Sequence, residues 1–122
     1  MAREETKYIV IHCSQTRPSQ KIGAKEIDRW HRERGWLKIG YGRVIKRCGT
    51  VEQGRGDDEI QAHVKGYNHC SFGLCLVGGA KEENWKEPED NFTAREYLLN
   101  EDIKNYKFQD GLTDDKDLQE LE

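Results

Sequence analysis

The run Tyr8-Ile9-Val10-Ile11-His12-Cys13-Ser14 decides the fold. This continuous series of apolar β-formers, which passes into the polar Ser14-Gln15-Thr16, is typical of a buried strand. His12 lies near the end of that strand, a common position for a metal ligand or a general base. A zinc site needs three or four ligands, so the meaning of His12 depends on what the rest of the chain supplies.

Length and composition predict one small, polar domain. The chain has 122 residues, 35% charged and 34% hydrophobic, so its core must come from a few apolar segments, 8–11, 36–45 and 72–77. No segment has the ~20 apolar residues of a membrane span, and the N-terminus has no apolar region typical of a signal peptide. We therefore expect a cytoplasmic protein without a membrane partner. The four cysteines show no C-x-x-C spacing, which favours reduced thiols.

The charge of the chain is distributed unevenly. The net charge is −3, but residues 110–122 carry six carboxylates against one lysine, a local net charge of −5 that leaves +2 for residues 1–109. We predict a single domain over 1–109 and an acidic tail over 110–122, either disordered or a short helix. The tail is interpreted either as a solubilising terminus or as an anionic arm for a basic surface.

The remaining elements predict an α/β domain. Five segments have the pattern of regular structure: a helix over 24–34, strands over 40–47, 51–55 and 71–77, and a last helix that opens at the capping box 93–96 and runs toward Tyr106. In the first helix Ile27, Trp30 and His31 have the i, i+3, i+4 spacing of one helix face, which is expected to face the core. We expect His31 to lie on the helix surface and Trp36 to cap the core after Gly35.

Seven motifs carry a family resemblance. In order they are His12-Cys13-Ser14, Trp30-His31 with Gly35-Trp36, Gly40-Tyr41 before 44–47, the hairpin 49–55, His63-x-x-Gly66-Tyr67-Asn68, the strand 73–79, and Asn91-Phe92-Thr93. Over roughly residues 7–94 the chain resembles the zinc N-acetylmuramoyl-L-alanine amidases, most closely their phage lysozymes, which share a fold with peptidoglycan recognition proteins. The resemblance implies a mixed β-sheet flanked by helices, with a zinc-bearing groove along one face and a degenerate C-terminal third.

The resemblance also implies roles for four residues. His12 corresponds to one zinc ligand, and Tyr41 to the tyrosine that assists the attack of zinc-bound water on the lactyl-alanine amide. His63 and Asn68 lie in the loop that contacts the substrate. In such sites three protein ligands leave a position for water, and the zinc ion lowers the pKa of that water to about 7. The sequence equally allows Tyr41 to be a half-buried packing tyrosine, and His63 and Asn68 to belong to a polar loop without a function.

The chain departs from this family toward its end. The family's other two ligands, a histidine and a cysteine, and its oxyanion lysine follow the final helix, whereas no histidine follows His69 and no cysteine follows Cys75. We therefore predict that His12 is a single surviving ligand, that it is hydrogen-bonded to a neighbour, and that Tyr41 is a catalytic relic. Zinc is expected only if unrecognised ligands complete the site. The nearby side chains that could serve as such ligands are His63, His69, Cys13, Cys70 and Cys75.

Tyr41 is followed by Gly42 and Arg43, where the family has a Tyr-His-Phe-like strand start. The charged Arg43 at a former core position suggests either relaxed selection or a new surface.

The preferred interpretation is a catalytically defective, phage lysozyme-like protein that acts by binding, as an inhibitor or regulator of a phage or host enzyme in the cytoplasm of an infected bacterium. The resemblance supports this because phage lysozymes of the family also regulate their RNA polymerase through a surface separate from the zinc groove. The alternatives are a zinc-dependent amidase that cleaves peptidoglycan and a peptidoglycan-binding module without catalysis.

The sequence also bears on two further kinds of partner. A homo-oligomer would cover a sheet face left exposed by the missing C-terminal third. A nucleic-acid partner is disfavoured because strand alternation splits the basic residues of the hairpin region between two faces, with no interleaved aromatic residues; these are Lys38, Arg43, Lys46, Arg47 and Arg55.

Overall fold

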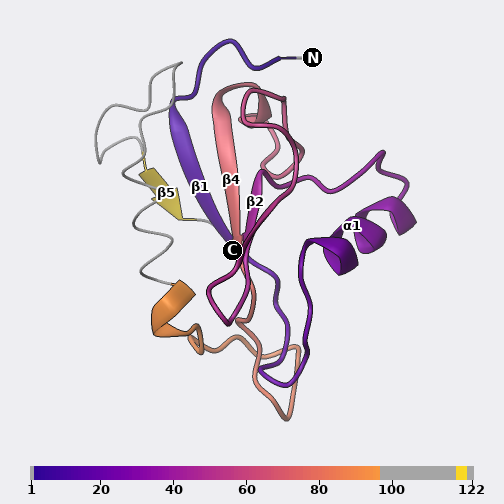
Figure 1. Ribbon diagram of the computed structural model, residues 1–122, viewed down its shortest axis with the longest axis vertical. Coiled ribbons are helices and arrows are strands. Elements are labelled where there is room, and N and C mark those ends of the chain that lie inside the picture. Colours follow the sequence, from indigo (N-terminus) through magenta and orange to yellow (C-terminus); the bar gives the residue numbers. More distant parts are fainter. Residues whose placement is uncertain (1, 97–117, 121–122) are drawn as a thin grey trace.

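The fold is built on a five-stranded mixed sheet. The computed structural model describes residues 2–96 and 118–120. Its elements are β1 (Tyr8–Cys13), α1 (Ala24–Glu33), β2 (Arg43–Ile45), β3 (Val51–Gln53), the short 3₁₀ helix η1 (Asn68–Cys70), β4 (Ser71–Leu76) and β5 (Leu118–Glu120). The strand order is β3-β2-β4-β1-β5, and every neighbouring pair is parallel except β2 with β3. Figure 1 shows β2, β4, β1 and β5 side by side. The predicted α/β class with a mixed sheet is confirmed.

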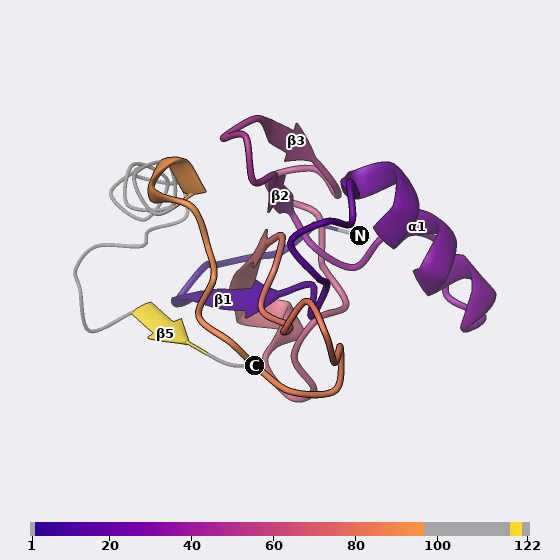
Figure 2. The ribbon, with the colours of Figure 1, turned by 90° about the horizontal axis from the view of Figure 1, so that it is seen from below.

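The sheet separates two apolar layers. All six residues of β4 are buried, as expected for a central strand covered on both faces. Ile27 of α1 packs with Val44 and Cys75 on one face, and Phe92 packs with Ile45 and Leu76 on the other. Figure 2 accordingly shows α1 and the start of the last helix on opposite sides of the sheet. In the part of the chain that the structure describes, no helix has the length and apolarity to cross a membrane, and none of the four cysteines is in a disulfide.

Helix α1 has the predicted extent, but two predictions about its end are wrong. His31 is buried, not on the surface, and the Trp36 side chain is 38% exposed, so it does not cap the core. The cause is the reversal at Gly35, whose φ of +92° only glycine adopts readily. The returning chain lets the Gly40 amide donate to His31 Nδ1 at 2.9 Å, while Trp36 covers the His31 ring from outside, with centroids 4.5 Å apart.

The hairpin is present, but its first strand is shorter than predicted. Only Arg43–Ile45 pair as a strand with Val51–Gln53. The strand ends there because the Lys46 carbonyl accepts a hydrogen bond from the Gly49 amide, which closes the turn. Most of the basic residues of this region have partners within the protein. Lys38 pairs with Glu59 at 2.7 Å, and the Arg55 guanidinium donates to the carbonyls of Ile39 and Ile60, both at 2.8 Å.

The C-terminal predictions have mixed outcomes. The capping box is confirmed, since the Thr93 amide donates to Glu96 Oε1 at 2.9 Å and the Glu96 amide to Thr93 Oγ1 at 3.2 Å. The course of that helix toward Tyr106 lies outside the described residues. Residues 118–120 form strand β5 beside β1, so the prediction of disorder or a helix is wrong there. Backbone pairing along the edge of β1 overrides their polar composition. The division at 109/110 stays a prediction.

Gly42 and Arg43 show how the altered strand start is accommodated. A Cβ at Gly42 would lie 2.5 Å from both Gln61 Nε2 and the Phe72 ring. The Arg43 guanidinium lies over the same ring, 5.6 Å from its centroid, and pairs with Asp57. Arg43 is therefore half-buried, with its charge neutralised at the protein surface.

We predict that Gly42→Ala lowers the free energy of unfolding by about 1–3 kcal/mol, because the added methyl group overpacks the space between Gln61 and Phe72. Urea denaturation measures the change. Gly56→Ala is the matched control, since its nearest neighbour would lie 3.8 Å away. Equal stability of the two variants would contradict this packing account.

Candidate functional site

The site is built around two imidazoles from distant parts of the chain. Strand β1 places His12 near its carboxyl end, and the loop before η1 brings His63 to it, with His12 Nε2 and His63 Nδ1 2.8 Å apart. Gly73 of β4 makes the approach possible, because a Cβ there would lie 2.8 Å from the His63 ring. The predicted hydrogen bond of His12 to a neighbour is thus confirmed, and the neighbour is His63.

The direction of each hydrogen bond follows from Ser71. Its hydroxyl donates its single proton to the Tyr67 carbonyl at 2.7 Å, so Ser71 Oγ must accept from His63 Nε2 at 3.0 Å. His63 therefore carries its proton on Nε2, and its Nδ1 accepts from His12 Nε2. The result is a directed chain of hydrogen bonds, from His12 through His63 to Ser71, that holds both imidazoles neutral in fixed tautomers.

Burial keeps this pair uncharged. Desolvation lowers the pKa of His12 to about 4. Desolvation, and then the neighbouring His12, lowers the pKa of His63 to about 3. Both side chains are therefore neutral at physiological pH.

Tyr41 and Cys75 complete the surroundings of His12. The Tyr41 ring lies 5.2 Å from the His12 ring between centroids, and Cys75 is the residue paired with His12 in the β1–β4 ladder. Burial, followed by the effect of the adjacent Cys75 thiol, raises the pKa of Tyr41. Burial also raises the pKa of Cys75. The Tyr41 hydroxyl is therefore protonated at neutral pH, and its ring lies against His12.

Asn68 holds the loop that carries His63 and does not itself contact the histidine pair. Its side-chain oxygen accepts from the amides of His63 and Val64, both at 2.9 Å. The loop that carries His63 is shaped by this contact, which is a positioning role. Of the four residues singled out from the sequence, His12, His63 and Tyr41 are thus brought together, and Asn68 supports one of them.

The described residues do not fit a catalytic zinc site. Such a site takes three protein ligands, and among residues 2–96 and 118–120 no three histidine, cysteine or acidic side chains come together around one point. The 2.8 Å separation of His12 and His63 is a hydrogen bond that uses both facing nitrogens, which leaves His12 Nδ1 as the one open lone pair of the two rings. The other donors considered from the sequence, His69, Cys13 and Cys70, do not join them.

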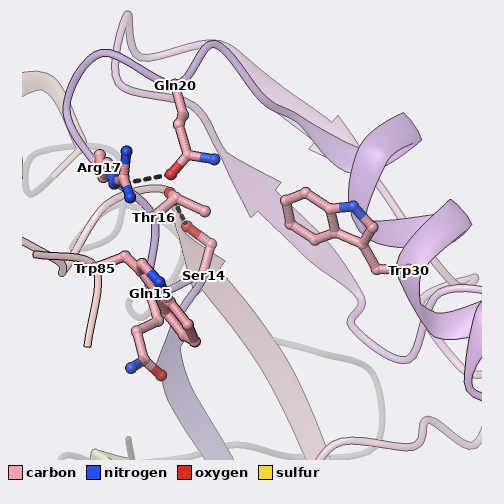
Figure 3. A pocket seen from close by; sticks show the side chains of 7 residues that line it. All are labelled: Ser14, Gln15, Thr16, Arg17, Gln20, Trp30 and Trp85. Carbon is pink, nitrogen blue, oxygen red and sulfur yellow. Dashed lines mark hydrogen bonds between the residues drawn. The ribbon is translucent and has the colours of Figure 1, made fainter.

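A cavity of about 390 Å³ lies beyond the carboxyl end of β1 (Figure 3). It is lined by residues 14–17, Gln20, Trp30 and Trp85. The chain stays in register with the sheet here, since the amides of Ser14 and Thr16 donate to the carbonyls of Leu76 and Gly78, both at 3.0 Å. Ser14 directly follows β1 and lies two residues after His12, so in extended backbone it is about 7 Å farther along.

Sequence reasoning missed this cavity. Trp85, an isolated aromatic residue within a run of charged side chains, was the available signal.

Comparison with known proteins defines the class to which this fold and site belong. A family model described as N-acetylmuramoyl-L-alanine amidase matches residues 2–115. The chain belongs to this amidase family. The match extends beyond residue 94, where the resemblance seen in the sequence was predicted to stop.

Among the relatives, the endolysin of Escherichia phage T7 is 52% identical over 91 residues, which cover 75% of this chain and 59% of that protein. Peptidoglycan-recognition protein SC1a of Drosophila melanogaster is 29% identical over 111 residues, 85% of this chain and 58% of that protein. The chain thus spans less than two thirds of the length of these relatives. The solved structure of peptidoglycan recognition protein-LE in complex with tracheal cytotoxin shares the fold, with a TM-score of 0.75 at 23% identity over 98% of this chain and 69% of that one.

We predict that the protein loses stability as the pH falls from 7 to 5. The folded pKa values of His12 and His63 lie below the ordinary value of 6.5, so below pH 6.5 the unfolded chain binds protons that the folded chain does not. Each histidine then contributes a loss of up to about 1.4 kcal/mol per pH unit, reduced by its partial exposure. Urea denaturation at pH 7, 6 and 5 measures the effect.

The matched variant is His63→Asn, whose amide oxygen replaces Nδ1 as the acceptor for His12. Its stability should fall less steeply with pH than that of the wild type. Parallel pH dependence in the two proteins would show that His63 is not held neutral by the fold.

Proposed function

We propose that this chain is a catalytically defective member of the amidase family that binds peptidoglycan without hydrolysing it. The observation that carries the proposal is the closed hydrogen-bond chain from His12 through His63 to Ser71. This hydrogen-bond chain occupies His12 Nε2 and both nitrogens of His63, so that only His12 Nδ1 keeps an open lone pair. A zinc hydrolase needs three protein ligands around its metal.

Three features support the binding part of the proposal. One relative is named a peptidoglycan-recognition protein, and the structure of peptidoglycan recognition protein-LE is described as a complex with monomeric diaminopimelic acid-type peptidoglycan. The polar cavity lies outside the carboxyl ends of parallel strands, where α/β sheets bind ligands. The neutral His12 and the protonated Tyr41 beside it supply hydrogen-bond partners without the desolvation cost of a charge.

A protein partner is the second candidate function, as an inhibitor or regulator of a phage or host enzyme in the cytoplasm. The observation that favours it is an apolar projection at the end of α1, where Leu37 is 80% exposed next to the partly exposed Trp36. This projection lies on the part of the chain that follows Gly35 and is separate from the cavity. Substitution of Leu37 by Ser would weaken such a contact without changing the binding of peptidoglycan.

The direct test combines three measurements on the purified chain, with an active endolysin in parallel. After exposure to zinc and removal of the excess, elemental analysis should find far less than one zinc per chain. The chain should co-sediment with purified cell-wall sacculi, and the turbidity of the sacculi should stay constant. Stoichiometric zinc together with falling turbidity would overturn the catalytic defect, and failure to co-sediment would overturn the binding function.

A further inference from the structure

The segment between α1 and β2 is attached to the helix by two hydrogen bonds whose acceptors can be protonated. The chain reverses after the helix and returns along it. There the Ile39 amide donates to Asp28 Oδ1 at 2.8 Å. The Gly40 amide donates to His31 Nδ1 at 2.9 Å, a contact that we call the latch. Together the two contacts fix the returning segment relative to α1.

His31 lies between the protein surface and the candidate site. Its side chain is buried, with its ring 4.5 Å from that of Trp36 and 5.4 Å from that of Tyr41, both between centroids. The Tyr41 ring in turn lies 5.2 Å from the His12 ring. Burial raises the pKa of Tyr41, so its hydroxyl is neutral where it meets the two imidazoles. A continuous series of ring contacts therefore leads from the partly exposed Trp36 to the histidine pair, with His31 in its middle.

Only the neutral form of His31 can close the latch. Because Nδ1 accepts the Gly40 proton, the proton of the imidazole itself is on Nε2. An imidazolium carries a proton on both nitrogens, which would set two donors, Nδ1–H and the Gly40 amide, against each other. Protonation of the ring therefore removes the acceptor and breaks this hydrogen bond.

The Gly40 backbone has little room to adjust. It is buried, and a Cβ at this position would lie 2.0 Å from the Ala62 carbonyl oxygen and 3.1 Å from the Trp36 ring. The Gly40 carbonyl also accepts from the Ala62 amide at 3.1 Å. A buried amide that loses its acceptor is costly, so loss of the latch favours movement of the whole segment away from α1.

The groups around His31 disfavour its charged form. Burial, and then the guanidinium of Arg34, lower the pKa of His31, and Arg55 acts in the same direction. The Asp28 carboxylate opposes them, although it is also paired with Arg32 at 2.7 Å. The released ring regains a more ordinary pKa, so below the ordinary value of 6.5 the open form binds a proton that the closed form does not. Acid therefore favours the open form.

We propose that the hydrogen bond between His31 and Gly40 is an acid-released latch that sets the position of the segment between α1 and β2. At neutral pH the neutral imidazole holds the segment against the helix. In acid the imidazole takes up a proton from the solvent, the Gly40 amide leaves Nδ1, and the segment moves away from α1. This opening is local, whereas the histidine pair acts on the stability of the whole domain.

Opening of the latch acts on two places at once. The apolar projection of Trp36 and Leu37 belongs to the released segment, and so does Tyr41, which directly follows Gly40 in the chain. Acid therefore changes both the surface offered to a protein partner and the surroundings of His12. This regulation is independent of the ligand that the site binds.

The test follows the Gly40 amide of the whole chain by hydrogen exchange, with each rate divided by the intrinsic rate at that pH. Between pH 7 and pH 5 the protection of Gly40 should fall about fivefold more than that of Leu74, which lies in the buried central strand and reports global unfolding. The imidazole nitrogens of His31 should titrate with the same midpoint as the Gly40 amide shift. Equal loss of protection at both amides, or protonation of His31 with an unchanged Gly40 amide, would overturn the proposal.

One variant distinguishes the latch from a merely structural contact. In His31→Asn the amide oxygen can replace Nδ1 as the acceptor for Gly40 but takes up no proton in this range. The protection of Gly40 relative to Leu74 should then be the same at pH 7 and pH 5. His69→Asn, the same substitution at an exposed histidine, should respond to acid like the wild type. A wild-type response in the His31→Asn protein would assign the effect to other groups and refute the latch.

Discussion

The parallel pairing of β1 with β4 is the constraint on which the site depends. It places His12 next to Cys75 and brings Gly73 under the ring of His63, so that the second imidazole can approach the first. The same ladder continues past β1, where the amides of Ser14 and Thr16 bond to the chain after β4. One set of backbone hydrogen bonds thus positions both the histidine pair and the rim of the cavity.

The histidine pair illustrates how a partner changes the chemistry of a residue. An imidazole at a strand end is available to a metal while its lone pairs are open. In this chain the hydroxyl of Ser71 sets the tautomer of His63, and His63 in turn takes the proton of His12. Burial keeps both rings neutral, because a charged imidazole there would lose its hydration without gaining a counter-ion. The proposed binding function rests on this arrangement.

The features that could be predicted from the sequence are those that depend on residues close together in the chain. The strand at 8–14, the central strand at 71–77, the helix ending at Gly35 and the capping box at Thr93 all follow from periodicity or turn chemistry, and the hydrogen-bonded state of His12 follows from the rule that buried polar groups are paired. His31 and the identity of the partner of His12 depend instead on where distant segments pack. The cavity depends on the contact of Ser19 with Glu82, 63 residues apart, which no local pattern encodes.

The central claim, that His12 is held by His63 and not by a metal, is tested most directly by nitrogen-15 NMR of the imidazole rings. The account predicts that both rings are neutral Nε2–H tautomers at pH 7, with a coupling across the hydrogen bond from His12 Nε2 to His63 Nδ1, unchanged by equimolar zinc. Loss of that coupling on addition of zinc, together with metal-induced shifts of the His12 nitrogens, would contradict it.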